Sequence, residues 1–269
     1  MNKIIAVDID GTLLNSNHQL TDVTKNSLIK AQENGNIVVI ASGRDPKGVE
    51  SYAKALKLDE FGGLISNYNG CRITNFKTKE IIINHSLDDT LLKEYINFTK
   101  NFDAPFLIYL DGKIFTNKKN SKIAEFSAWI NKMDLVVKED ILDNIDYKLN
   151  NIILSHESKE ILDKFETPIR EKFANSLEIV RSTDNYLEAM PKGFDKGTSL
   201  IEIAKYYDYD IKDIIAFGDE RNDIGMIKDA GVGVAMGNAH PIIKKLADYI
   251  TLTNDEDGIA YYLEKFKLI

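Results

Sequence analysis

Two aspartates, Asp8 and Asp10, follow directly on an apolar run near the start of the chain. The segment Ile4–Val7 is apolar throughout, which is typical of a central parallel strand covered on both faces. Open α/β sheets bind ligands at the carboxyl ends of such strands, and the strand period of two directs both aspartates to one side. Gly11 would let the backbone turn sharply and approach a ligand. Taken alone, these residues fit a ligand site and an ordinary Asp-Gly turn equally well.

Three further strand ends or helix starts carry polar chemistry. They are Ser42 after an apolar run at 37–41, Lys196 at the start of a helical pattern, and Gly218-Asp219-Glu220-Arg221-Asn222-Asp223 after an apolar run at 214–217. If these ends meet, Asp8, Asp10, Asp219 and Asp223 form a group of carboxylates whose repulsion is costly unless a cation neutralises it. Oxygen ligands of this kind suit Mg²⁺, which combines one or two carboxylates with waters and a substrate phosphate.

The bulk properties narrow the class of protein. A chain of 269 residues is long enough for one large domain or two smaller ones. The net charge of −8 and the pI near 5.2 argue against nucleic acid as a partner. A small phosphorylated substrate is still compatible with this charge, because a bound cation dominates locally. Cys71 is the only cysteine, and no apolar run is long enough for a signal peptide or a membrane span, so we expect a cytoplasmic protein without a membrane partner.

The order of the patterns predicts an α/β fold, namely a doubly wound parallel sheet interrupted by an inserted α+β domain. Buried-strand patterns alternate with helical ones at both ends of the chain, and a hairpin pattern at 72–83 precedes the insert. We therefore predict a core of residues 1–83 and 191–269 and an insert of residues 84–190. The predicted helices are 17–34, 91–102, 121–133, 196–207 and 259–266, and the predicted strands include 37–41, 64–67, 106–110, 151–154, 177–180, 214–217, 232–235 and 249–252.

These motifs resemble those of a known superfamily. Asp8-Ile9-Asp10-Gly11-Thr12, Ser42, Lys196 and Gly218-Asp219-Glu220-Arg221-Asn222-Asp223 are similar, in order, to the four motifs of haloacid-dehalogenase (HAD) superfamily phosphatases. Further runs resemble the Cof-type subfamily with its type-IIB cap: Ala41-Ser42-Gly43-Arg44, Asn69-Gly70, Lys192-Gly193-Phe194-Asp195-Lys196-Gly197, Val234-Ala235-Met236-Gly237-Asn238-Ala239 and Asp257-Gly258. The resemblance implies a Rossmann-like core and an inserted cap that selects the substrate.

The resemblance also implies roles for individual residues. Asp8 would be the nucleophile that forms an aspartyl phosphate, since a carboxylate needs no base to attack phosphorus. Asp10 would protonate the leaving oxygen and then deprotonate the attacking water, while its backbone carbonyl helps to hold Mg²⁺. Lys196 would offset the negative charge of Asp8 and phosphate, and Asp219 and Asp223 would bind the metal or orient its ligands.

A second group of residues would bind the phosphate or the rest of the substrate. Ser42 would donate hydrogen bonds to the phosphoryl oxygens, assisted by backbone N–H groups near Gly11 and Gly43. Asn222 would hydrogen-bond around the site. Arg44 and Asn69 are candidate substrate contacts, but a surface ion pair for Arg44 and a turn role for Asn69 fit their positions equally well.

The leading hypothesis is a Mg²⁺-dependent phosphatase that acts on a small phosphorylated metabolite such as a sugar phosphate. Two alternatives stay open. A phosphomutase would share the aspartyl phosphate but return the phosphoryl group to its substrate. A regulatory module would bind a phosphorylated ligand without catalysis. Asp10 argues against the regulatory module, because a phosphate acceptor alone needs no acid and base. The sequence does not predict the oligomeric state.

Overall fold

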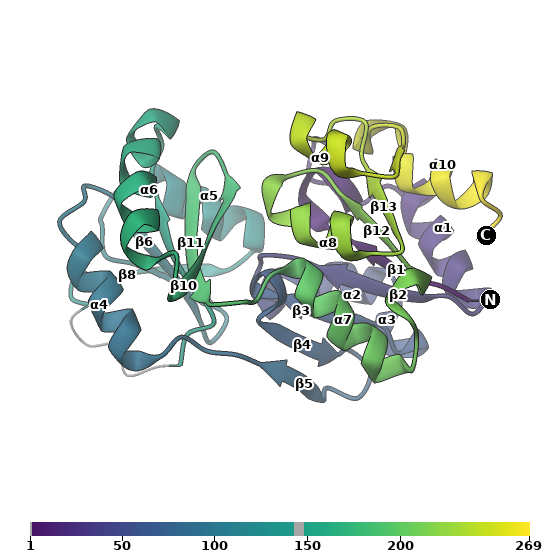
Figure 1. The fold of residues 1–269 in the computed structure, drawn as a ribbon, viewed down its shortest axis with the longest axis horizontal. Coiled ribbons are helices and arrows are strands. Elements are labelled where there is room, and N and C mark those ends of the chain that lie inside the picture. Colours follow the sequence, from purple (N-terminus) through teal and green to yellow (C-terminus); the bar gives the residue numbers. More distant parts are fainter. Residues whose placement is uncertain (1, 143–147) are drawn as a thin grey trace. The chain divides into compact units, whose positions relative to one another are not determined.

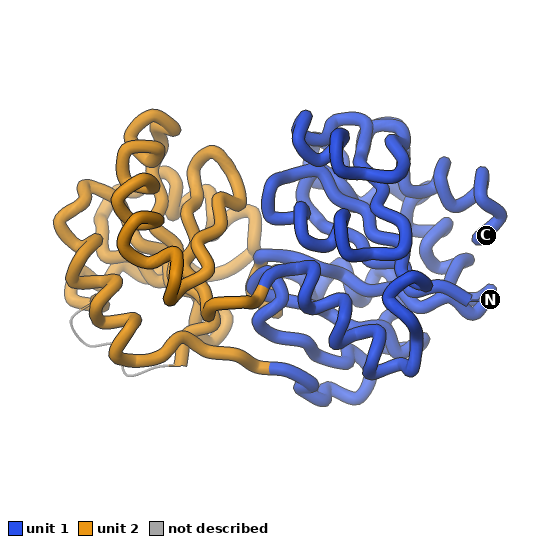
Figure 2. The backbone as a smooth tube through the Cα atoms, viewed as in Figure 1, with its two compact units in different colours: residues 1–43, 49–83, 195–269 blue, residues 44–48, 84–194 orange. Residues whose placement is uncertain are grey.

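The computed structural model describes residues 2–142 and 148–269, so residues 1 and 143–147 of the predicted core and insert lie outside the described residues. The described chain divides into two compact units, shown in different colours in Figure 2. Unit 1 contains residues 1–43, 49–83 and 195–269, and unit 2 contains residues 44–48 and 84–194. The short segment 44–48 therefore groups with unit 2, although its neighbours in the sequence belong to unit 1.

Unit 1 is built on a sheet of eight strands in the described chain (Figure 1). The strand order is β14-β13-β12-β1-β2-β3-β4-β5, and the pairs from β14 to β3 are parallel. The strands are β1 (Ile4–Val7), β2 (Ile37–Ala41), β3 (Leu64–Asn67), β4 (Arg72–Asn75), β5 (Ile81–Asn84), β12 (Ile214–Gly218), β13 (Val232–Ala235) and β14 (Tyr249–Ile250). The chain proceeds from β1 to one side and later returns to the other side as β12, so the switch point lies beside β1, where open α/β sheets bind ligands.

The helices of unit 1 bury their apolar sides in a single hydrophobic core with the strands. They are α1 (Asp22–Glu33), α2 (Pro46–Ala55), α3 (Leu58–Phe61), α7 (Lys196–Tyr207), α8 (Ile224–Asp229), α9 (Pro241–Leu246) and α10 (Gly258–Lys265). All four residues of β1 are fully buried, as the continuous apolar run predicts for a central strand. The predicted helix at 17–34 begins later than expected, at Asp22, where Thr21 accepts a hydrogen bond from the backbone N–H of Thr24.

Unit 2 is an α+β unit around a mostly antiparallel sheet with the strand order β10-β11-β9-β6-β7-β8. Only β7 and β8 pair in parallel among its described strands. The strands are β6 (Phe106–Leu110), β7 (Lys113–Thr116), β8 (Asp134–Val137), β9 (Ile152–Ser155), β10 (Leu177–Thr183) and β11 (Tyr186–Pro191), and the helices are α4 (Asp89–Thr99), α5 (Lys122–Asn131) and α6 (Lys159–Phe173).

Both faces of the sheet in unit 2 are covered. Successive residues of a strand point to opposite faces, so Phe106 and Ile108 join one cluster with side chains of α4 and α6. Leu107 joins a second cluster with Ala124 and Ala128 of α5. The described residues form no helix that is both long and apolar enough to cross a membrane.

We expect the substitution Leu154→Ala to destabilise the protein strongly. Leu154 is fully buried in the cluster beneath α4 and α6, so the truncation should lower the free energy of unfolding by about 2–5 kcal/mol. The matched control is Leu246→Ala, at a leucine that is 38% exposed. This substitution should change the free energy of unfolding by less than about 0.5 kcal/mol. Denaturant unfolding followed by circular dichroism measures both, and equal effects would show that the assignment of this core is wrong.

Candidate active site

The site in unit 1 lies at the switch point of the sheet. Strand β1 pairs in parallel with β12 and β2, and the register aligns Val7 with Phe217 and with Ile40. The residue that follows β1 is Asp8, whose backbone N–H donates to the Phe217 carbonyl at 3.0 Å. The residues that follow these three strands therefore meet at one sheet edge, as predicted from their order in the sequence.

Lys196 joins two of the aspartates by ion pairs. Its Nζ lies 2.5 Å from Oδ1 of Asp8 and 2.6 Å from Oδ1 of Asp223, and its side chain is fully buried. Lys196 is the first residue of α7, where the Asp195 carboxylate accepts from the N–H of Thr198 and the Thr198 hydroxyl accepts from the N–H of Asp195. This reciprocal capping fixes the start of the helix, and with it the direction of the lysine.

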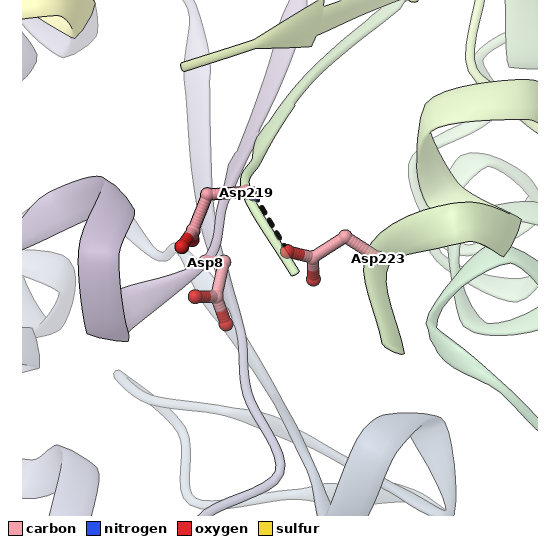
Figure 3. A group of neighbouring side chains, drawn as sticks. All are labelled: Asp8, Asp219 and Asp223. Carbon is pink, nitrogen blue, oxygen red and sulfur yellow. Dashed lines mark hydrogen bonds between the residues drawn. The ribbon is translucent and has the colours of Figure 1, made fainter. Parts of the chain in front are cut away.

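Asp219 completes the cluster of carboxylates (Figure 3). One ligand atom from each of Asp8, Asp219 and Asp223 lies within 4.8 Å of the others. Oδ1 of Asp219 accepts from the Thr12 hydroxyl at 2.7 Å. The Asp8 and Asp219 carboxylates are close together in Figure 3, whereas the Asp223 carboxylate is turned toward the backbone of Asp219.

Both carboxylate oxygens of Asp223 are engaged by the protein. Oδ1 accepts from Lys196, and Oδ2 accepts from the backbone N–H groups of Asp219 at 2.9 Å and Glu220 at 3.1 Å. The side chain is fully buried. These bonds shape the loop that carries Asp219, so the geometry favours an orienting role for Asp223 over direct contact with a metal.

The cluster holds more negative than positive charge. Burial raises the pKa of Asp8 to about 7; Lys196 opposes this shift, and the neighbouring Asp223 and Asp10 add to it. Burial also raises the pKa of Asp219 well above its usual value, together with repulsion from Asp8 and Asp223. Burial alone would lower the pKa of Lys196, but attraction to Asp223 and Asp8 raises it. One ammonium does not balance three carboxylates, so hard oxygen ligands and excess charge fit a divalent cation such as Mg²⁺.

Gly11 allows the turn after β1 to pass close to Asp219. Its φ is +78°, and a Cβ atom at this position would collide with the Asp219 carboxylate. The Gly11 carbonyl accepts from Nδ2 of Asn238 at 2.8 Å. Thr12 and Asn238 were not among the predicted site residues, although each stands within a run that resembles a superfamily motif. Their contacts depend on tertiary structure, which the sequence spacing does not specify.

The predicted phosphate-binding residues of unit 1 form a second group beside the carboxylates. The backbone N–H of Asn69 donates to the Ser42 carbonyl at 3.0 Å, and the N–H of Ser42 donates to the Ser66 carbonyl at 2.8 Å. Nδ2 of Asn222 donates to Oδ1 of Asn69 at 2.9 Å. A Cβ atom on Gly43 would lie 3.2 Å from the same Oδ1. The loops after β2, β3 and β12 are therefore joined.

Asp10 and Arg44 stand apart from these two groups. Arg44 is buried, with 7% exposure, so a surface ion pair, the alternative given for it above, does not fit its position. The Asp10 side chain is 45% exposed, and its Oδ1 lies 4.0 Å from Nδ1 of His18, a residue that was not among the predicted site residues. Arg44 belongs to unit 2, where its Nη1 donates to the Ile130 carbonyl at 3.2 Å and the Gly48 carbonyl at 3.4 Å. Its guanidinium is thus anchored to the end of α5.

Known proteins share this arrangement over nearly the whole chain. The haloacid dehalogenase-like hydrolase family matches residues 5–263. The 5-amino-6-(5-phospho-D-ribitylamino)uracil phosphatase YcsE of Bacillus subtilis is 31% identical, with 96% of this chain and 93% of that protein covered. A solved haloacid dehalogenase-like hydrolase from Bacteroides thetaiotaomicron is 34% identical with a TM-score of 0.90, covering 99% of this chain and all of that one. The HAD subclass IIB sugar phosphatase BT4131 is 25% identical with a TM-score of 0.85 over both full chains.

The fold and the carboxylate cluster at the switch point are those of a hydrolase of the HAD type, with a Rossmann-like core. The chain belongs to the haloacid dehalogenase-like hydrolase family. The predicted family and the predicted fold, a parallel-sheet core with an inserted α+β unit, are confirmed, and the subclass of BT4131 agrees with the predicted type-IIB cap. The predicted enzyme class, a phosphoric monoester hydrolase, is confirmed by the family and by relatives that are named phosphatases.

The charge imbalance predicts how Mg²⁺ should affect stability at different pH values. The folded, metal-free protein keeps a proton on Asp8 up to about pH 7, whereas the unfolded chain releases it near 3.8. Folding therefore takes up a proton between these values, and the free energy of unfolding falls as the pH rises through this window. Mg²⁺ takes the place of this proton. The increase in Tm that follows the addition of Mg²⁺ should therefore be larger at about pH 8 than at about pH 5.

Differential scanning calorimetry with and without Mg²⁺ measures this difference. The Asp219→Asn variant is the control, since it removes one charge from the cluster and should show a smaller increase at the higher pH. An increase in Tm that is the same at both pH values would contradict the assignment of the cation to these carboxylates.

Proposed function

We propose that the protein is a Mg²⁺-dependent phosphatase that hydrolyses a small phosphorylated metabolite through an aspartyl-phosphate intermediate. The observation that carries the proposal is the cluster of Asp8, Asp219 and Asp223 at the switch point of the sheet, in which the buried Asp8 and Asp223 share one ammonium and Asp219 is half-buried. A site of this kind is suited to a cation and a substrate phosphate together.

The first step uses Asp8 as the nucleophile. Its Oδ1 is held by Lys196, which fixes the carboxylate and offsets charge as phosphate approaches. One Asp8 oxygen forms a bond to phosphorus while the bond from phosphorus to the leaving oxygen breaks. Asp10 donates a proton to that leaving oxygen, and its exposed position allows exchange with solvent. The alcohol product then departs, and the enzyme is left as an aspartyl phosphate.

The second step releases inorganic phosphate. Asp10, now a carboxylate, accepts a proton from water as the water oxygen attacks phosphorus, and the bond between phosphorus and Asp8 breaks. Ser42, the backbone near Gly11 and Gly43, and Asn222 would hold the phosphoryl oxygens in both steps. Arg44, whose guanidinium is bonded to the Ile130 carbonyl within unit 2, is proposed as a substrate contact.

The metal would be held by Asp8, Asp219 and the backbone carbonyl of Asp10, with Asp223 orienting the loop that carries Asp219. When bound, Mg²⁺ would neutralise the charge that Asp8 and the phosphoryl oxygens bring together. The excess of buried carboxylates over ammonium groups supports this assignment.

The substrate is proposed to be a phosphate monoester of a small hydroxylated carbon chain. The name of YcsE specifies a phosphorylated ribityl group, and BT4131 is described as a sugar phosphatase. Unit 2 is proposed to act as the cap that selects the substrate. The cytoplasmic location and the absence of nucleic acid as a partner stay predictions from the sequence.

Substitution of the two aspartates after β1 should block different steps. Asp8→Asn removes the nucleophile and should lower kcat by at least about 10³-fold without forming a phosphoenzyme, because the amide does not attack phosphorus. Asp10→Asn keeps the nucleophile but lacks the base for the second step, so it should accumulate phosphoenzyme with an activated substrate such as p-nitrophenyl phosphate. Acid quench and mass spectrometry detect the modified Asp8, and substantial turnover by Asp8→Asn would refute its role.

A panel of phosphate esters distinguishes the proposal from its alternatives. We expect release of inorganic phosphate from sugar and polyol phosphates, and loss of that release on addition of EDTA, restored by excess Mg²⁺. An isomerised sugar phosphate without free phosphate would instead indicate a phosphomutase. Tight binding of a phosphate ester without turnover across the panel would indicate a regulatory module.

A further inference from the structure

Three consecutive residues after β3 have left-handed backbone conformations. The φ angles are +51° for Tyr68, +51° for Asn69 and +103° for Gly70. This region is uncommon for residues other than glycine, above all for a bulky side chain such as tyrosine. All three residues are buried. Strain of this kind persists only where the surrounding structure imposes it, and it is concentrated at functional sites.

Asn69, the middle residue of this turn, is 1% exposed and joins two loops of the active site. Its backbone N–H donates to the carbonyl of Ser42, and its side-chain Oδ1 accepts from Nδ2 of Asn222 at 2.9 Å. The same Oδ1 lies so close to Gly43 that a Cβ atom there would be 3.2 Å away. Asn69 thus fixes the backbone after β2 and the amide orientation of Asn222 after β12.

Gly70 brings the same turn against the start of α7. A Cβ atom on Gly70 would collide with the backbone carbonyl of Asp195 and lie 3.1 Å from Cβ of Ser199. Ser66, at the end of β3, donates from its hydroxyl to the Ser199 hydroxyl at 3.0 Å. The turn therefore contacts the helix that presents Lys196, in addition to the loops of Ser42 and Asn222.

We propose that Asn69 is a positioning residue for phosphoryl transfer, acting through Asn222 and the backbone of Ser42 and Gly43. This inference rests on the proposed function. Asparagine tolerates a positive φ better than most residues, and the bond between its buried amide and Asn222 is a contact that glycine would lack. The strained turn holds three loops in one geometry, which matters because small displacements of reacting groups reduce the rate strongly.

The first test is the variant Asn69→Gly. Glycine adopts the positive φ of this position without strain, so the substitution removes only the side chain. It should keep Tm within a few degrees of the wild type, while kcat falls by about 10–100-fold and KM changes little. Asp208→Gly is the matched control, because Asp208 also has a left-handed φ of +57° but is exposed at the end of α7. It should leave kcat unchanged.

The second test is a double-mutant cycle with Asn222→Ala. If Asn69 acts through Asn222, the double variant should lose about as much kcat/KM as the more damaging single variant. Losses that multiply would overturn the proposal and leave Asn69 as a turn residue. A rise in KM with unchanged kcat in Asn69→Gly would also overturn it, because that result indicates direct binding of the substrate.

The affinity for orthovanadate, a mimic of the transferring phosphoryl group, separates this proposal from the function on which it rests. Asn69→Gly should weaken vanadate binding by the same factor as kcat/KM, measured by calorimetry in the presence of Mg²⁺. If the wild type releases no phosphate but shows this vanadate effect, the proposed phosphatase fails and the positioning role stands. If the wild type is active and Asn69→Gly matches it in both measurements, the positioning role fails.

Discussion

The structure of unit 1 depends on one electrostatic constraint, the gathering of three carboxylates, two of them buried, beside a single buried ammonium. Asp8 and Asp219 lie at neighbouring strand ends, and Asp223 and Lys196 come from the segments that follow β12 and begin α7. Without a bound cation, a cluster of carboxylates is stable only if its oxygens have hydrogen-bond partners or carry protons. Lys196 and the N–H groups behind Asp223 bond to both oxygens of that residue, Lys196 also bonds to Oδ1 of Asp8, and the Thr12 hydroxyl bonds to Oδ1 of Asp219.

This constraint explains why residues far apart in the sequence are needed at fixed places. The switch point brings the ends of β1 and β12 together, although the two strands are separated by more than half of the chain. The insert joins unit 1 at residues 83–84 and 194–195, and the second connection comes directly before the capped start of α7 that carries Lys196. The segment 44–48 groups with unit 2 directly after Ser42 and Gly43, so the chain itself connects the proposed phosphate loop to the proposed cap.

Much of the fold could be predicted from local patterns, because buried parallel strands and capped helices have strong signals. The helix from Lys196 to Tyr207 was predicted with the observed bounds, and its start coincides with the capping box of Asp195. Helix α6 was not predicted, since Pro168 stands in its middle and proline disfavours a helix interior. Burial of Leu162, Ile169 and Phe173 outweighs that local preference. Strand β8 has only four residues and was also not predicted.

The site was predictable to the extent that its residues stand at strand ends. Spacing indicated that Asp8, Asp219 and Lys196 would meet, and the structure brings them together, while their chemical roles stay proposals. Spacing could not decide between a turn and a site for Asn69, because its bond to Asn222 joins loops 153 positions apart. Nor could it show that both oxygens of Asp223 are occupied by Lys196 and backbone N–H groups. Such facts arise only from tertiary packing.

The most direct measurement is a crystal structure of the protein with Mg²⁺ and beryllium fluoride, which imitates a phosphoryl group bound to a carboxylate. We expect a fluoroberyllate attached to an Asp8 oxygen, with Mg²⁺ coordinated by Asp8 and Asp219 and the Lys196 ion pairs retained. Fluoroberyllate on another residue, or a metal bound away from the Asp8 and Asp219 carboxylates, would contradict it.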